Sequence, residues 1–158
     1  MEKNGVPTRA ELRDLYEDYA ETLDDDRVEE WPAFFTEDGV YQVIARESYD
    51  QGLTHATIYC KGAAMIRDRA AAIRQTAVFE PRSLRQFISN VRAHAKDGAI
   101  GAGANFLVIE SLYDAEPQIL MVGRYIDTLV RENGALKFKQ RLAVYDNYRV
   151  RTTLVMPV

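Results

Sequence analysis

Tyrosines and a few acidic and histidine side chains are the residues of this chain that could carry proton-transfer chemistry. A general acid and a general base held in an apolar cavity can act at neutral pH, because burial sets their pKa values. The possible donors are Tyr16, Tyr19, Tyr41, Tyr59 and Tyr125, and the possible bases are Asp38, Asp127 and His94. The sequence fixes no pair of a base with a tyrosine, and buried tyrosines are more often core residues with one bonded polar tip. We therefore expect no catalytic residue in this chain.

Residues that ligate metals are scarce. Cys60 is the single cysteine, and His55 and His94 are the two histidines. A Rieske cluster needs two residues of each kind, and a Cys/His zinc site needs four ligands, so neither can be built here. A site of two histidines and one carboxylate would need both histidines. Both are expected at the surface instead, and the acidic run 24–26 as a solvated turn, so we expect no metal site.

Arginine is concentrated in the middle of an otherwise acidic chain of net charge −4. Its planar guanidinium makes bidentate bonds to carboxylates and stacks on aromatic rings, which suits subunit interfaces. Arg82 and Arg85, on the approach to a sheet edge, are expected to contact a neighbouring subunit. Arg92 is a further candidate. So is Met156 in the apolar tail 154–158, because an exposed apolar end is unfavourable.

Composition excludes several classes of protein. The acidic balance argues against nucleic acid as a partner. No apolar run approaches the ~18 residues that a membrane span needs, and the N-terminus has no apolar signal region. The 158 residues are long enough for one domain with a real core. We therefore expect a single cytoplasmic domain over residues 1–158 that contacts neither membrane nor nucleic acid.

Helices and short strands are expected first, and four long strands after them. Thr8 and Glu11 have capping-box spacing for a first helix, and Asp26 and Glu29 for a short second one. A turn at 36–39, short strands at 40–44 and 54–59, a loop at 47–52 and a helix from residue 62 follow. Alternating residues then predict strands at about 83–95, 100–113, 118–130 and 136–144, with hairpin signals at 96–98 and 132–134. In the last strand Arg141 is expected on the solvated face.

This order predicts an α+β fold, with the helices packed on one face of a strongly curved antiparallel sheet. Such a sheet closed by helices forms a cone with an apolar interior. Tyr16, Trp31, Tyr41 and Tyr125 are the candidates to line a pocket inside it.

The chain resembles the small (β) subunits of bacterial aromatic-ring-hydroxylating dioxygenases. The segments that carry this resemblance, spread over nearly the whole length, are 30–41, 46–53, 65–69, 85–90 and 141–146. The nearest in appearance are small subunits that act on carboxylated rings, such as those of salicylate 5-hydroxylase and terephthalate dioxygenase. Gln86 departs from the pattern, since many relatives have histidine there.

The resemblance implies a nuclear-transport-factor-like (cystatin-like) cone in a complex of three large and three small subunits, with the small ones associated around a three-fold axis. It implies that the large (α) subunit holds the Rieske [2Fe-2S] cluster and the mononuclear iron, and that this chain holds no cofactor. The chain would then be a non-catalytic structural subunit of an oxidoreductase that degrades aromatic compounds. An alternative is a stand-alone isomerase or dehydratase that uses the cone as a pocket, like ketosteroid isomerase or scytalone dehydratase. A binding module without an enzyme partner is a third possibility.

Overall fold

The computed structural model of the chain describes residues 5–75, 81–150 and 154–158. The helices are α1 (Arg9–Asp24), the 3₁₀ helix η1 (Val28–Phe34), α2 (Arg46–Asp50) and α3 (Ala63–Gln75). The strands are β1 (Phe35–Ala45), β2 (Ile58–Lys61), β3 (Arg82–Lys96), β4 (Ala99–Leu112), β5 (Gln118–Glu132) and β6 (Ala135–Tyr145). Within these described ranges, no helix is long and apolar enough to cross a membrane.

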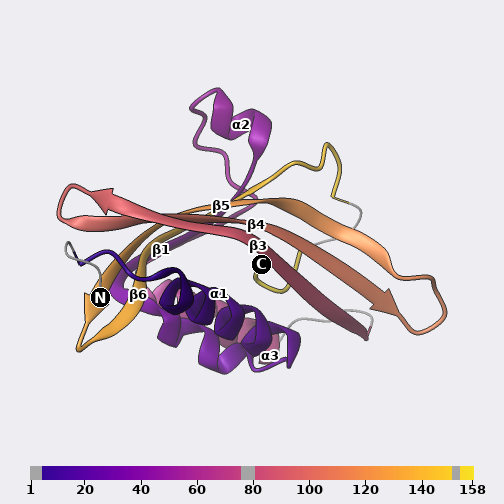
Figure 1. The fold of residues 1–158 in the computed structure, drawn as a ribbon. Helices are drawn as coiled ribbons and strands as arrows, with labels where there is room; N and C mark the ends of the chain where they lie inside the picture. Colours follow the sequence, from indigo (N-terminus) through magenta and orange to yellow (C-terminus); the bar gives the residue numbers. More distant parts are fainter. Residues whose placement is uncertain (1–4, 76–80, 151–153) are drawn as a thin grey trace.

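The six strands form one curved sheet in the order β2-β1-β6-β5-β4-β3. All neighbours are antiparallel except β1 and β6, which run parallel. Figure 1 shows α1 and α3 on the concave side of the sheet, with the C-terminus between them and the strands, and α2 on the opposite, outer side. The expected α+β fold is therefore confirmed, and the interior lies between the sheet and the two long helices.

Helix α1 begins as its sequence predicts. The Thr8 hydroxyl accepts a hydrogen bond from the Glu11 backbone N–H at 3.2 Å, and the Glu11 carboxylate accepts one from the Thr8 N–H at 2.8 Å. This reciprocal capping box satisfies two N–H groups that the first turn leaves without partners. The helix then buries the stripe of Leu12, Tyr16 and Tyr19 against the sheet.

Four expectations for residues 26–61 are wrong in detail. The second helix is a 3₁₀ helix without a side-chain cap, because Asp26 adopts φ +58° and cannot cap it. The predicted turn 36–39 belongs to β1, where an irregularity in the pairing with β6 absorbs the turn residues. The predicted loop 47–52 overlaps the short helix α2, which begins at Arg46, and the strand predicted at 54–59 lies at Ile58–Lys61.

The hairpin signals of the long strands are confirmed. Asp97-Gly98 and Asn133-Gly134 each place two residues at positive φ, between +40° and +83°, as two-residue turns between twisted strands require. A bulge in β3 was not expected. Asn90 has φ +58°, and the β3–β4 pairing shifts between Ser89 and Arg92.

This bulge reverses which side chains of β3 face the interior. Gln86 is buried before it and Val91 after it, whereas the sequence pattern placed these two on opposite faces. Phe87, expected on the same face as Val91, therefore lies on the outer side with 55% of its surface exposed.

Strand β6 buries both of its faces over its last five residues. The pairing of β5 with β6 shifts between Thr128 and Leu129, so that Phe138 and Arg141 both face the interior. Leu142 and Val144 cover the outer face beside Ile44 and below Tyr49 of α2. The expected position of Arg141 on a solvated face is therefore wrong: its side chain is fully buried.

Candidate functional site

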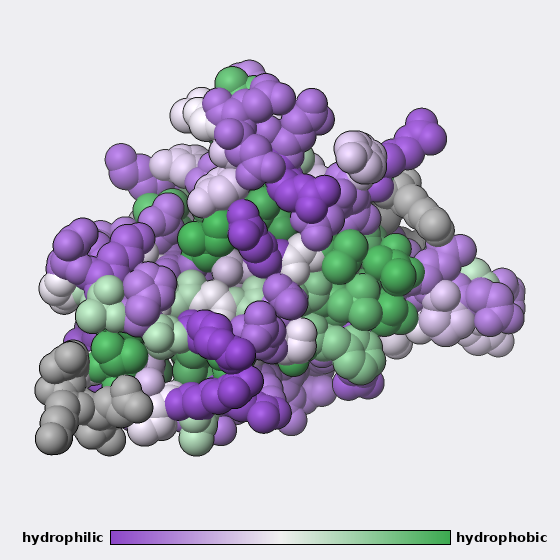
Figure 2. Space-filling view, turned by 45° about the horizontal axis from the view of Figure 1, so that its top comes forward, coloured by the Kyte–Doolittle hydropathy of each residue, from purple (hydrophilic) through white to green (hydrophobic). Residues whose placement is uncertain are grey.

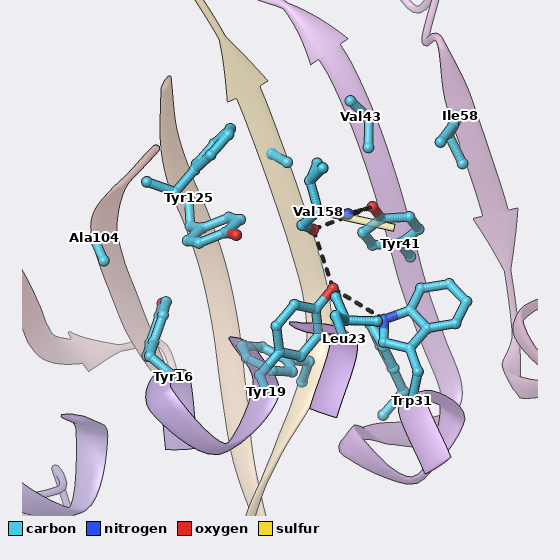
Figure 3. Packing of buried hydrophobic residues seen from close by; sticks show 14 of the residues in the cluster. Tyr16, Tyr19, Leu23, Trp31, Tyr41, Val43, Ile58, Ala104, Tyr125 and Val158 are labelled. Carbon is cyan, nitrogen blue, oxygen red and sulfur yellow. Dashed lines mark hydrogen bonds between the residues drawn. The ribbon is translucent and has the colours of Figure 1, made fainter. Parts of the chain in front are cut away.

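Five aromatic residues from four elements converge inside the cone. Tyr16 and Tyr19 come from α1, Trp31 from η1, Tyr41 from β1 and Tyr125 from β5, and each is at most 2% exposed. Figure 3 shows their rings turned toward one another between helix and sheet. The four residues proposed to line a pocket are thus brought together with Tyr19.

A buried ion pair lies among these rings. Arg141 Nη1 is 3.4 Å from Asp127 Oδ2, and both side chains are fully buried. The Tyr16 hydroxyl donates to the same carboxylate oxygen. The Arg141 guanidinium carbon lies 3.5 Å from the centre of the Tyr125 ring and 4.0 Å from that of Tyr19, which places the cation against aromatic faces.

Burial controls the protonation of this cluster. Burial raises the pKa of Asp127 to about 6, although the Arg141 charge and the Tyr16 hydrogen bond both act to lower it. Asp127 is therefore still mainly ionised at neutral pH. Burial also raises the pKa values of the Tyr16, Tyr19, Tyr41 and Tyr125 phenols, which consequently stay protonated as hydrogen-bond donors.

The raised pKa of Asp127 predicts a pH-dependent stability. Because the folded chain holds the Asp127 proton more tightly than the unfolded chain, this group favours folding as the pH falls below about 6, and loses that contribution as the pH rises through 6. Relative to Asp127→Asn, which has no such proton, the native chain should gain about 1 kcal/mol of unfolding free energy between roughly pH 7 and pH 5. Urea unfolding of both chains at the two pH values measures this gain. A constant difference between them, or a loss, would contradict the assignment.

Val158 fills the space beside the ion pair. Its carbonyl oxygen accepts hydrogen bonds from the Tyr19 hydroxyl at 3.1 Å and the Tyr41 hydroxyl at 3.2 Å, and its N–H donates to the Tyr41 oxygen at 2.9 Å. Arg69 of α3 holds the same segment by donating to the carbonyl oxygens of Leu154 and Val155. The chain's own tail thus occupies the interior that a pocket enzyme would keep open.

Met156 belongs to this tail and is buried by its own chain, with 8% of its surface exposed. It had been expected at an interface between subunits. The difference has a physical cause. The carbonyl oxygens of the tail accept hydrogen bonds from side chains of the interior, and these bonds hold the apolar residues of the tail inside the cone.

The other acid–base candidates lie outside the interior. Tyr59 is half exposed on β2, and Asp38 and His94 are exposed. In the part of the chain that the structure describes, no group of three or more histidine, cysteine, aspartate or glutamate residues could hold a metal ion. His55 is exposed on a loop and Cys60 is buried in β2, so these donors do not fit a Rieske cluster or a mononuclear iron site.

The three arginines of β3 that are interface candidates differ in how exposed they are and in the partners they already have. Arg82 pairs with Glu110, and both side chains are nearly buried. Arg85 is 67% exposed and reaches Asp24 only at 4.0 Å. Arg92 is exposed and bonds the carbonyl oxygen of Val91. Arg85 and Arg92 are thus the members of this group whose charges are open to a partner.

An apolar patch adjoins Arg85 on the outer face of the sheet. Phe87 pairs with Leu107, and Leu107 with Val122, so that one row of apolar side chains crosses β3, β4 and β5. The next row joins Arg85 to Ile109 and Ile119. We call the five apolar residues of these rows the outer patch: Phe87, Leu107, Ile109, Ile119 and Val122. Figure 2 shows apolar surface gathered on this face beside α2.

A groove separates the outer patch from α2. Its volume is about 580 Å³, and Phe87, Leu107 and Val122 line one part of it. The ion pair between Arg46 and Asp146, at 3.2 Å, lies at its other side. An apolar area with a polar, charged rim is the usual anatomy of a protein–protein contact.

Comparison with known proteins places the chain in a family. A sequence profile described as ring hydroxylating beta subunit matches residues 18–152. The chain belongs to this family. The small subunit of anthranilate 1,2-dioxygenase from Burkholderia cepacia is 34% identical over 154 residues, which cover 97% of this chain and 96% of that subunit. The beta 2 subunit of the terminal oxygenase component of terephthalate 1,2-dioxygenase from Comamonas sp. is 28% identical over 141 residues, 89% of this chain and 92% of that one.

A crystal structure agrees. The beta subunit assigned to an aromatic-ring-hydroxylating dioxygenase of Novosphingobium aromaticivorans superposes with a TM-score of 0.86 at 33% identity, over 95% of this chain and 96% of that one. The resemblance and the cone predicted from it are therefore confirmed. As a beta subunit of ring-hydroxylating dioxygenases, the chain is part of an oxidoreductase complex and has a large oxygenase subunit as its partner.

Two residues of this beta subunit's interior were missed by reasoning from the sequence. The alternation of β6 puts Arg141 on the wrong face. Counting residues back from the Asn133-Gly134 turn, with one bulge, pairs Arg141 with Asp127 of β5, and this count is the signal that could have found it. Val158 was grouped with an interface tail, and no local pattern marks it as a core residue.

Proposed function

We propose that this beta subunit is structural and non-catalytic, and that it holds iron-bearing large subunits in place within a cytoplasmic oxygenase. The filled interior carries the proposal. Asp127 is enclosed by Arg141 and Tyr16, and the adjoining space is taken by Val158, so no reactant can approach the buried acid and phenols in this conformation.

The cofactors of the complex belong to the large subunit in this account. A Rieske centre needs two cysteines and two histidines, and the chain has one cysteine in total. The Rieske [2Fe-2S] cluster and the mononuclear iron would supply the oxidation chemistry from the partner. The reaction of the whole complex would insert oxygen from dioxygen into an aromatic ring, using electrons relayed from NAD(P)H.

The assembly we propose has three large and three small subunits, with the small ones around a three-fold axis. The outer patch and Arg85 form the contact with a neighbouring subunit. Apolar side chains as exposed as Phe87 and Ile119, at 55% and 53%, are better accommodated under a partner than in water. Arg85 beside them offers a guanidinium to a partner's carboxylate.

A carboxylated aromatic ring is the substrate class we propose for the whole complex, in the degradation of aromatic compounds. Two relatives support it by their names, since anthranilate and terephthalate both carry a carboxylate on the ring.

Purification of the chain with and without its large subunit tests this function. The chain alone should fold, but it should bind no stoichiometric iron, show no visible absorption and lack oxygenase activity. The co-expressed pair should contain iron, absorb visible light and show oxygenase activity. Stoichiometric iron on the isolated chain would overturn the proposal. Turnover of a ketone or enol substrate by the chain alone would favour the isomerase or dehydratase alternative.

A further inference from the structure

Three basic side chains form a row at the end of β3. Arg92, His94 and Lys96 are exposed and lie on the outer side of the sheet, since the neighbouring Val91 is buried on the inner side. Their partners on β4 have no acidic side chain: Gly103, Gly101 and Ala99. Arg92 donates to the Val91 carbonyl oxygen at 2.8 Å and Lys96 to the Thr128 hydroxyl at 3.4 Å, and both acceptors are neutral. We call these three residues the basic row; no carboxylate in the described part of the chain pairs with it.

Two carboxylates on α1 also lack a partner. Asp14 and Asp18 are exposed about one helical turn apart, and neither carboxylate bonds or pairs with another residue that the structure describes. Like charges at this spacing destabilise a helix slightly. Both line a recess of about 430 Å³ together with three apolar side chains: Leu15, Phe34 and Leu136. This acidic pair, as we call Asp14 and Asp18, therefore suits a cation carried on a long apolar stem.

The cations that line the same recess are engaged elsewhere. Arg131 lies 2.9 Å from the Glu11 carboxylate. The Lys137 ammonium donates to the carbonyl oxygen of Ala33. The recess thus leaves the charge of the acidic pair open to a cation from outside it.

The basic row cannot supply this cation to its own chain. It lies on the outer side of the sheet, whereas α1 packs on the concave side, as Figure 1 shows. The acidic pair is on the flank of α1 toward the β5–β6 hairpin, and the flank beside β3 carries Arg9, Arg13 and Glu17. Two copies of the chain can join the two surfaces. A three-fold ring needs such a contact, because its subunits meet through two different surfaces, whereas a two-fold axis pairs one surface with itself.

We propose that the basic row of one small subunit binds the acidic pair of the next, which joins three small subunits head to tail in a ring. The stem of Arg92 lies along the apolar lining of the recess, and its guanidinium bonds the carboxylates of Asp14 and Asp18. Lys96 adds a second cation beside them. This contact presupposes the proposed three-fold assembly and adds to it the two surfaces that meet.

Charge reversal in the small subunit of the co-expressed complex tests this contact. Arg92→Glu with Lys96→Glu places acidic groups against the acidic pair, and Asp14→Lys with Asp18→Lys places basic groups against the basic row. Each double variant should weaken the assembly by roughly tenfold or more, because like charges then meet. A chain with all four substitutions has opposite charges facing each other again, so it should assemble within about threefold of the native chain. Sedimentation of the complex over a dilution series measures the assembly.

Two further variants locate the contact. Asp68→Lys is the matched control, since Asp68 is an exposed carboxylate on α3 outside the recess, and it should leave the assembly unchanged. A complex whose small subunit carries both Arg92→Cys and Asp18→Cys should be linked by a short bismaleimide into pairs and trios of small subunits. Either cysteine alone should give no linked small subunits. The native Cys60 is buried and does not compete.

The outcomes separate this contact from the assembly on which it rests. An intact complex that neither charge reversal weakens would overturn the contact while the three-fold assembly stands. So would four combined substitutions that restore nothing, or a double-cysteine chain that stays unlinked. A native complex without three small subunits would refute the assembly and the contact together.

Discussion

Arg141→Met should lower the unfolding free energy of the chain by about 3–5 kcal/mol at neutral pH. The substitution keeps an apolar stem of similar length but removes the cation that pairs with Asp127, whose side chain is fully buried. It also removes a cation packed 3.5 Å from the centre of the Tyr125 ring. Urea or thermal unfolding measures the loss.

Two companion variants separate the charge effect from lost packing. Asp127→Asn should also lower the unfolding free energy, because it leaves the buried Arg141 guanidinium without its carboxylate, although the guanidinium keeps its aromatic neighbours. Replacing both residues, with Asp127→Leu and Arg141→Met, should recover most of the stability, since an apolar pair needs no compensating charge. A double variant as unstable as Arg141→Met alone would show that packing, and not charge, dominates.

Phe87→Asp should prevent assembly of the complex while leaving the fold of the chain intact. Phe87 is the most exposed side chain of the outer patch, and burying an aspartate there against a partner would leave an unpaired charge. Loss of one buried aromatic anchor typically weakens an interface by about 2 kcal/mol or more, or roughly 30-fold. Arg85→Ala should weaken assembly less, because it removes only a rim charge. Sedimentation of the co-expressed subunits measures both effects.

Tyr59→Asp is the matched control. Tyr59 is 50% exposed, close to the 55% of Phe87, but lies on β2 at the opposite edge of the sheet. It should leave assembly unchanged. Should Phe87→Asp assemble as well as the native chain, or Tyr59→Asp disrupt assembly equally, the outer patch would not be the contact surface.

The elements that could be predicted from the sequence are those fixed by local chemistry. The capping box of Thr8 and Glu11 and the Asn133-Gly134 hairpin depend on residues a few positions apart, and both are present. The family could also be predicted from the sequence, because segments typical of it follow one another in the expected order along most of the chain.

Bulges account for most of what the sequence did not reveal. One extra residue at Asn90 moves Gln86 inside and Phe87 outside, and a shift in the β5–β6 pairing turns Arg141 inward. Such shifts are set by packing between strands, and alternation within one strand cannot show them. The position of Val158 depends on hydrogen-bond donors from three other elements, so it can be recognised only in the three-dimensional structure.

We propose that this chain supports catalysis without taking part in it. The turnover number per iron of the assembled complex, with Tyr16→Phe in the small subunit, tests this directly. Tyr16 is the phenol bonded to the buried Asp127, and thus the donor that an acid–base mechanism inside the cone would use. We expect a turnover number within about twofold of that of the native complex. A fall of roughly 100-fold or more, the usual loss when a general acid is removed, with assembly and iron content unchanged, would contradict it.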